Sequence, residues 1–480
     1  MRKLLLFSVL YLFLWPSVAS ATTTIHGYAI AHQGKEVFLY RYSDLITYTE
    51  QLLTQTTVGQ DGSFEMQTDE PATFLGLLKV EDVNGHLYIE ANKNYNVVFP
   101  EEELQQTKLY SMVYFVQLEV LDNDQDELNN LITRYKTGND RYVASNYMEI
   151  YNKRARPATD SFLSAQNKKV AHVETPYFKT YARYTSATLK LTSYFSKKRL
   201  FEEHLKPSDL DYDNDACMNF FSQFFNHSIK SLFLSKKEQD IKNALSKEGN
   251  YQILSDLLSK EPFLQNNQIR ELAIMNELYH HQSDLGVSPQ YLLALLDTIE
   301  STSPFQEHRL IAANMKKRLN YMAPGTKAPS FNLRDFQGKV WSLEDFKGRY
   351  VYINFWSSWC TSCYQQLSIL SEIRKNYHKD IEFINIVIDS DPETVQKKIA
   401  PFDFDMIFLH YADDKKIKEA FDIRAIPSSY IIDPESNFFL APAPPPGVNL
   451  ARAIVNIERK IRPGKERKFE WQELPEPPPK

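Results

Sequence analysis

The chain has 480 residues, of which 55 are lysine or arginine and 61 are aspartate or glutamate, giving a formal net charge of −6 at pH 7. This balance lacks the basic excess of a nucleic-acid-binding protein, so we expect no nucleic-acid partner. The length gives room for about three domains with separate cores, and a total of only 14 glycines favours long helices over many tight turns.

Residues 1–21 have the layout of a secretory signal peptide. Arg2-Lys3 precedes the apolar run Leu4–Trp15, which is too short to cross a bilayer, and Ala19-Ser20-Ala21 supplies the small residues of a cleavage site. No cysteine follows the apolar run for lipid attachment. We therefore expect cleavage after Ala21, export to the periplasm and no membrane anchor. Outside the cytosol, a Cys-x-x-Cys pair stays oxidised unless a dedicated electron donor reduces it.

Residues 22–100 are rich in short β-branched and aromatic runs, with turn dipeptides such as Asp61-Gly62 and Asn84-Gly85 between them. The runs are Ile25–Ala31, Lys35–Tyr42, Leu52–Val58, Ser63–Gln67, Thr73–Val80, Leu87–Glu90 and Tyr95–Phe99. This pattern predicts an antiparallel β-sandwich. The segment contains no cluster of acid/base or ligand side chains, which favours a docking or spacer module over a glycan- or peptide-binding site.

Residues 101–322 predict an all-α domain. The clearest helix is Ser288–Glu300, where Pro289 occupies the first position and Tyr291, Leu292, Leu295, Leu296 and Ile299 form one apolar stripe. Other helices are expected near Asp126–Tyr135, Asn267–His281 and Phe305–Leu319.

Two acidic clusters in this segment have spacings similar to those of calcium-binding loops. In the first, Asp122, Asp124 and Asp126 are followed by Glu127 where the loop needs glycine, and by Thr133 where it needs a bidentate glutamate. The second cluster, Asp209, Asp211, Asp213 and Asp215, fails in the same way. Both precede predicted helices, so we interpret these acids as helix-capping groups and expect no metal site.

Residues 323–463 alternate strands and helices, which predicts an α/β sheet covered by helices on both sides. A hairpin spans Ala328–Leu343, and strands are expected at Val351–Trp356, Ile381–Ile388, Met406–His410 and Ile426–Asp433, the last leading into a hairpin that ends at Leu440. Helices are expected after the cysteines, at Pro392–Ile399 and at Lys415–Phe421, and a final helix carries Leu450, Ile454, Ile457 and Ile461 on one face. Residues 464–480 are expected to form a disordered tail.

The chemistry lies where the strand Val351–Trp356 meets the next helix. Two cysteines three residues apart, Cys360 and Cys363, lie on one face of a first helical turn with Cα atoms about 5–6 Å apart, which a disulfide accepts. Cys360 lies at the helix N-terminus, where unpaired amides and the helix dipole lower a thiol pKa below its free value of about 8.5. Cys363, one turn further in, is placed to resolve a mixed disulfide by attacking the sulfur of Cys360.

Two other interpretations of the cysteines are weaker. An inert disulfide closing so short a loop contributes little stability. Zinc needs about four ligands, whereas the remaining cysteine is Cys217 and the neighbouring rings of His280 and His281 point in different directions on a helix. Cys217, beside Met218 and Phe220, is expected to be a small buried hydrophobe.

Several motifs resemble, in order and spacing, the TlpA/ResA-like branch of the thioredoxin superfamily: Ala328-Pro329, Phe336–Gly338, the segment Asn354–Cys363, and Ile426-Pro427 followed by Ile431-Ile432-Asp433. The resemblance covers about 140 residues. It implies a thioredoxin-like fold with Cys360 and Cys363 as the catalytic residues and their disulfide as the only redox group. It further implies that Trp359, Ile426 and Pro427 contact the substrate, and that the Ile426-Pro427 peptide is cis and faces the cysteines. The preceding segments are similar, more weakly, to extra modules of exported Bacteroidota proteins.

The chain departs from this pattern at several positions. Thr361-Ser362 stands between the cysteines where reductants often have Gly-Pro, and hydroxyls that donate to a Cys360 thiolate make the pair more oxidising. Asn354 replaces a buried acid, and Gln366 replaces a glutamate, so Cys363 lacks an obvious base. The proline-rich segment Ala441–Gly447 either walls the substrate groove or is a plain linker.

We therefore interpret the protein as an exported thiol–disulfide oxidoreductase, most simply a reductase of protein disulfides. Its expected partners are protein thiols or disulfides and a membrane or periplasmic electron donor. Oxidation or isomerisation of disulfides is the alternative within the enzyme class. A non-enzymatic envelope binding or scaffold protein, in which the thioredoxin-like unit is structural, is the alternative outside it.

Overall fold

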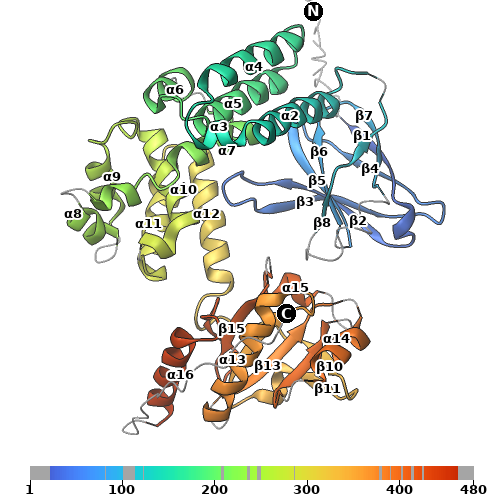
Figure 1. Cartoon of the computed structure of the whole chain (residues 1–480), viewed down its shortest axis with the longest axis vertical. Coiled ribbons are helices and arrows are strands. Elements are labelled where there is room, and N and C mark those ends of the chain that lie inside the picture. The colour runs from blue at the N-terminus through green and yellow to red at the C-terminus, as the bar shows by residue number, and fades with distance from the viewer. Residues whose placement is uncertain are drawn as a thin grey trace, which may run out of the picture.

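The computed structural model describes residues 22–462 except 82, 101–113, 123, 207–209, 235–237, 246–249, 286, 378–380, 390, 402–403, 412–415 and 424–425. The expected signal peptide and the expected tail at 464–480 lie outside the described residues. In chain order, the described elements form a β-rich part, a helical part and an α/β part (Figure 1).

The β-rich part contains two sheets. Its strands are β1 (Thr23–Tyr28), β2 (Glu36–Tyr42), β3 (Glu50–Thr57), β4 (Ser63–Thr68), β5 (Phe74–Val80), β6 (Val83–Ile89), β7 (Asn94–Val98), β8 (Tyr114–Val116) and β9 (Glu119–Val120). The 4-stranded sheet has the order β4-β1-β7-β9 and the 5-stranded sheet the order β3-β2-β5-β6-β8. Each β-rich run of the sequence forms a strand. In β4, Phe64 and Met66 face inward and alternate with exposed residues, as expected of a half-buried strand.

Two features of this part differ from the prediction. The pairs β1–β7 and β6–β8 are parallel, so the expectation of an entirely antiparallel sandwich is wrong there. Parallel neighbours need a long crossover, which the strands between β1 and β7 provide. In addition, β8 and β9 add an edge strand to each sheet, so residues 114–120 do not belong to the helical part as predicted.

The helical part follows. Its helices are α2 (Leu128–Ser145), α3 (Tyr147–Tyr151), α4 (Arg156–Lys169), α5 (Pro176–Thr192), α6 (Lys197–His204), α7 (Asp215–Phe225), α8 (Glu238–Asn243), α9 (Tyr251–Leu258), α10 (Asn267–Leu285), α11 (Pro289–Thr302) and α12 (Gln306–Tyr321). The predicted helices near 126–135, 267–281, 288–300 and 305–319 are all present. Their shared core includes Phe220, Phe221 and Cys217, each 0% exposed, which confirms the prediction for Cys217.

The acidic clusters of this part make local contacts. The Glu127 carboxylate caps α2 by accepting from the Asn130 amide at 2.8 Å, and Asp122 accepts from the Asp124 amide at 2.9 Å. In the second cluster, Asp215 lies in the first turn of α7 as expected, but the cap of that helix is Asn214 and not one of the acids; Asp209 lies outside the described residues. Within the part of the chain that the structure describes, no three His, Cys, Asp or Glu side chains form a group that could hold a metal ion.

The α/β part is built on a 7-stranded sheet of order β11-β10-β14-β13-β12-β15-β16. The strands are β10 (Asn332–Asp335), β11 (Val340–Ser342), β12 (Tyr350–Trp356), β13 (Ile381–Val387), β14 (Ile407–His410), β15 (Ser428–Ile432) and β16 (Phe438–Leu440). The helices are α13 (Thr361–Tyr377), α14 (Pro392–Ile399), α15 (Ile417–Ala420) and α16 (Val448–Ile461). β12 lies near the centre, parallel to β13 and antiparallel to β15.

Helices cover both faces of this sheet. Residues of α13 and α16 pack on one face with Tyr352 and Phe383, whereas α15 packs on the other with Ile353 and Ile384. In α16, Leu450, Ile454 and Ile457 are buried as predicted. Ile461, at the helix end, is 44% exposed instead. Among the described helices, none has the length and apolar character needed to cross a membrane.

Candidate active site

The central strand β12 leads to the predicted redox site. Val351, Tyr352, Ile353, Asn354, Phe355 and Trp356 are all buried. The Trp356 carbonyl accepts from the Ile388 amide at 3.0 Å, so pairing with the chain after β13 continues to the end of β12. Because parallel neighbours end at the same edge of a sheet, the segment after β12 and the segment after β13 lie together.

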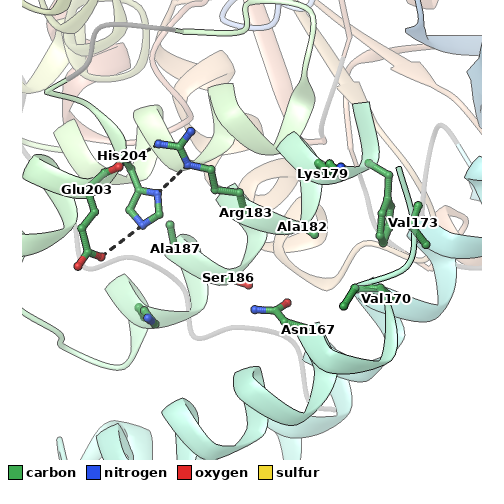
Figure 2. A pocket seen from close by; sticks show the side chains of 13 residues that line it. Asn167, Val170, Val173, Lys179, Ala182, Arg183, Ser186, Ala187, Glu203 and His204 are labelled. Carbon is green, nitrogen blue, oxygen red and sulfur yellow. Dashed lines mark hydrogen bonds and ion pairs between the residues drawn. The ribbon is translucent and has the colours of Figure 1, made fainter. Parts of the chain in front are cut away.

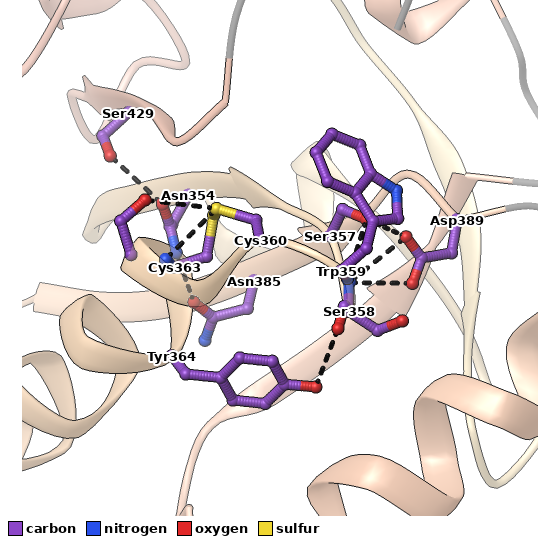
Figure 3. Close-up of a disulfide and its surroundings, with 11 residues drawn as sticks. Asn354, Ser357, Ser358, Trp359, Cys360, Cys363, Tyr364, Asn385, Asp389 and Ser429 are labelled. Carbon is purple, nitrogen blue, oxygen red and sulfur yellow. Dashed lines mark hydrogen bonds between the residues drawn. A yellow bond between two sulfur atoms is a disulfide. The ribbon is translucent and has the colours of Figure 1, made fainter. Parts of the chain in front are cut away.

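The loop Ser357–Trp359 is held at this edge by side chains from three segments, and two of these side chains, Asp389 and Tyr364, are labelled in Figure 3. Asp389, just after β13, accepts from the Ser357 hydroxyl and from the Ser358 amide, the latter at 2.8 Å to Oδ2. Lys398 of α14 donates to the Ser358 carbonyl at 3.3 Å, and Tyr364 of α13 donates to the same carbonyl at 3.3 Å. These bonds fix the backbone directly before Cys360.

Cys360 and Cys363 form a disulfide with a Cα–Cα distance of 5.3 Å, within the predicted range. The two sulfurs have different environments: Cys360 is 8% exposed and Cys363 is 0% exposed. The Cys363 amide donates to Cys360 Sγ at 3.2 Å, and the Ser362 hydroxyl lies 3.4 Å from the same sulfur. Hydrogen-bond donors favour a thiolate, so these two donors would stabilise a negative charge on Cys360 Sγ. The side chain of Thr361 is not among those described.

The peptide bond Ile426-Pro427 is cis, as the family resemblance implied. Half-buried Ile426 packs on the cluster that contains Cys360, Cys363 and Trp356. Trp359 packs on the same cluster, and so does Phe336 from the turn between β10 and β11. The predicted site residues Cys360, Cys363, Trp359 and Ile426 are therefore brought together, with Pro427 adjacent in the chain. Their catalytic and binding roles stay predictions.

A chain of neutral polar side chains crosses the neighbouring strands. Asn354, which is 0% exposed, donates to Asn385 at 3.1 Å and accepts from the Ser429 hydroxyl at 3.3 Å. Gln366 of α13 has a buried Oε1 without a hydrogen-bond partner among the described residues. Neither position supplies a carboxylate that could take a proton from Cys363.

Sequence reasoning missed three features of the site. Asp389 and Lys398 carry no motif of their own, and only the fold brings them to Ser358. A second cis bond, Ala441-Pro442, was not expected. The segment after it packs away from the cysteines, because Ala443 lies in the cluster with Tyr352 and Leu450. The proline-rich segment Ala441–Gly447 therefore fits neither of the two expected roles, a wall of the substrate groove or a plain linker.

A separate cavity of about 420 Å³ lies between α4, α5 and α6 of the helical part (Figure 2). Arg183 donates to the His204 ring at 3.3 Å and to the Glu203 carbonyl at 2.9 Å. Burial, assisted by Arg183, lowers the pKa of His204 to about 4. His204 is thus a neutral acceptor at neutral pH, and the cavity contains no cysteine among its lining residues.

Comparison with known proteins concerns the α/β part. Residues 324–438 match the model of the AhpC/TSA family. Thioredoxin-like protein YneN of Bacillus subtilis (strain 168) is 31% identical over 111 residues, which are 23% of this chain and 65% of YneN. Thiol-disulfide oxidoreductase ResA of Bacillus thuringiensis subsp. konkukian is 33% identical over 115 residues, again 23% of this chain and 65% of the relative.

Among solved structures, a putative thiol-disulfide oxidoreductase from Bacteroides vulgatus is 30% identical, with a TM-score of 0.27 and coverage of 28% of this chain and 97% of that one. The chain thus spans 65% of the length of its first curated relatives. The matched region includes the strand β12, both cysteines and the cis peptide.

Proposed function

We propose that this protein is a thiol–disulfide oxidoreductase that reduces protein disulfides through Cys360 and Cys363, and the match of residues 324–438 to the model of the AhpC/TSA family supports the proposal. One observation carries the proposal. In the disulfide at the start of α13, Cys360 is 8% exposed and its sulfur has two hydrogen-bond donors nearby, whereas Cys363 is 0% exposed. A purely structural cross-link needs no such asymmetry, and a loop this short gains little stability from it.

In the proposed reaction, the Cys360 thiolate attacks one sulfur of a client disulfide and the other client sulfur leaves as a thiolate, which takes up a proton. Cys363 then loses its proton and attacks Cys360 Sγ, and the second client thiolate leaves. Two electrons pass from the protein dithiol to the client, and the protein ends as the Cys360–Cys363 disulfide. An external thiol donor must restore the dithiol, and no other redox group is needed.

The surroundings of the disulfide provide for client binding. The Ile426 side chain packs on the cluster that contains the disulfide, and we assign its backbone to pairing with an extended client segment. Trp359 and Ile426 present half-buried apolar surface for the client residues that flank the cysteine. We assign Trp359, Ile426 and Pro427 to client binding on this basis.

The proposed setting is the periplasm, with an electron donor in the membrane or the periplasm. The support is the signal-like segment Arg2–Ala21 together with a redox pair that stays functional only where a donor is supplied. The relatives are named thiol-disulfide oxidoreductases, ResA among them, a name that covers both directions of the reaction; reduction is the direction proposed here, with oxidation or isomerisation as the alternative. The Ser362 contact to Cys360 favours the dithiol form, so it raises the reduction potential of the pair and makes it a stronger oxidant than it would be without this contact.

A disulfide-reduction assay on the full chain tests the proposal. The protein should accelerate the reduction of insulin disulfides by dithiothreitol, and Cys360→Ser should abolish the acceleration. Cys217→Ser is the matched control, because this buried thiol lies in the helical core, and it should retain the full rate. Absence of acceleration by the unmodified protein would favour a scaffold role. Faster oxidation of a reduced client than reduction of its disulfide would favour an oxidase.

A further inference from the structure

Two side chains of opposite charge hold Ser358 from opposite sides. The Ser358 amide donates to both carboxylate oxygens of Asp389, at 2.8 and 3.2 Å. The Ser358 carbonyl and hydroxyl oxygens accept from the Lys398 ammonium at 3.3 and 3.2 Å. Asp389 follows β13 and Lys398 lies in α14, so neither residue is near the Cys-x-x-Cys motif in sequence. Figure 3 shows the Asp389 side of this arrangement beside the disulfide.

We propose that Asp389 and Lys398 are positioning residues with opposite effects on the balance between the disulfide and dithiol forms of Cys360 and Cys363. Asp389 opposes the thiolate at Cys360 and Lys398 favours it. The inference rests on the proposed redox function, and it names two residues that set the equilibrium between the disulfide and the dithiol.

The loop of Ser357 and Ser358, which Asp389 holds by hydrogen bonds, connects Asp389 to Cys360. Asp389 is 8% exposed and also accepts from Ser357, which is 0% exposed. The Ser357 carbonyl in turn accepts from the Cys360 amide at 3.2 Å. A carboxylate held by buried donors cannot turn away when a thiolate forms. The chain from Ser358 to Cys360 spans at most about 7 Å between Cα atoms, and charges in partly buried sites are screened less than those at the surface.

Lys398 acts from the solvent side. Its side chain is exposed, but its ammonium is fixed by two bonds to Ser358 rather than by a carboxylate. A cation near a thiolate favours the charged form. Because water screens an exposed ammonium, its effect should be smaller than that of Asp389.

Few other titratable groups face this loop among the described residues. Tyr364 donates to the Ser358 carbonyl at 3.3 Å, and burial followed by the Asp389 charge raises its pKa, so it stays neutral. Asp335, on the hairpin side, is engaged with the Trp341 indole at 2.8 Å and with the amides of its own turn. Asp391 caps α14 and is exposed. Asp389 and Lys398 are the charged groups bonded directly to Ser358.

The test uses three variants of the full chain: Asp389→Asn, Lys398→Met and Asp391→Asn. The last removes an equal charge two residues from Asp389 and keeps a good helix cap, because asparagine caps as well as aspartate. Each variant is equilibrated with defined ratios of reduced and oxidised glutathione, and the dithiol fraction is counted by alkylation and intact mass. The alkylation rate of Cys360 against pH gives the midpoint of its thiol titration.

Asp389→Asn should shift the equilibrium about tenfold toward the dithiol, which is about 30 mV, and should lower the Cys360 titration midpoint. Lys398→Met should shift the equilibrium about threefold toward the disulfide and should raise the Cys360 titration midpoint. Asp391→Asn should change the equilibrium less than twofold. Shifts of the same sign in Asp389→Asn and Lys398→Met, or a fall in melting temperature without a shift in either, would overturn the inference.

If Asp389→Asn does not fold, Lys398→Met decides alone, since removing an exposed ammonium leaves the core intact. An unchanged equilibrium in Lys398→Met would then overturn the inference. The glutathione equilibrium does not depend on a client. If Asp389→Asn and Lys398→Met shift the equilibrium in opposite directions as expected, but the unmodified protein reduces no client disulfide, the inference is upheld and the proposed function is refuted.

Discussion

Replacing Cys363 by serine should convert a transient mixed disulfide into a long-lived one. Cys363 Sγ is bonded to Cys360 Sγ in the disulfide, so in the mixed disulfide it needs almost no movement to attack. Well-oriented intramolecular reactions reach effective molarities of about 10⁵ M or more. A millimolar external thiol is then about 10⁸-fold less effective, and the trapped state should last long enough to isolate.

The Cys363→Ser substitution also lowers the stability of the folded protein, by an amount that follows from the surroundings of Cys363. Cys363 is 0% exposed and lies among apolar residues, so a serine hydroxyl without a partner there costs about 1–3 kcal/mol. That loss lowers the melting temperature of the domain but leaves Cys360 at the helix start. Non-reducing electrophoresis after rapid acid quenching should show clients on Cys363→Ser as reducible high-mass bands, and Cys360→Ser should show none. Equal trapping by both variants would refute the assignment of Cys360 as the attacking sulfur.

Three further predictions follow from other contacts. Ser362→Ala removes a hydroxyl 3.4 Å from Cys360 Sγ; it should make the pair more reducing by about 15–30 mV in glutathione titration, and an unchanged or higher potential would contradict the role of Ser362. Burial raises the pKa of Cys217 to about 11, so iodoacetamide at pH 8 should modify it only after unfolding in urea, as peptide mass analysis can check. Burial alone raises the pKa of Glu271, but hydrogen bonds from His308, Ser303 and Tyr251 lower it overall. The resulting stability is present above the usual carboxyl pKa of 4.5 and is lost as the pH falls through the lowered pKa of Glu271 in the folded protein. Glu271→Gln should therefore reduce the fall in melting temperature between pH 5 and 3, and an unchanged fall would count against this network.

Local patterns in the sequence predicted the strands β1–β7, the helices α2 and α10–α12 and the redox pair, but not β8, β9 or the helices α3–α6, α8 and α9. Alternation in runs such as Ser63–Thr68 and the apolar stripe of Pro289–Thr302 reflect contacts with a single core, so each is readable from its own segment. Cys360 and Cys363 are also predictable from their own segment, because residues three apart are neighbours on one face of a helix. The cis bond at Pro427 was predictable only through the family resemblance, since about 5–6% of such bonds are cis in folded proteins.

What the sequence did not reveal depends on contacts between distant segments. The parallel pairings of β7 and β8 depend on where long connections return the chain. Asp389 reaches Ser358 only because β12 and β13 are parallel and end at one edge. Ile461 continues the apolar spacing of α16 but is the last residue of that helix and is exposed.

The small exposure of Cys360 limits which molecules can use this site. Only 8% of the residue is accessible, and thiol–disulfide exchange requires direct contact between the attacking and attacked sulfurs. A client disulfide recessed in a folded protein cannot make that contact, whereas one on a protruding or unfolded segment can. The depth of one cysteine thus acts as a steric filter, and under the proposed function the clients should be proteins whose disulfides lie on protruding or unfolded segments.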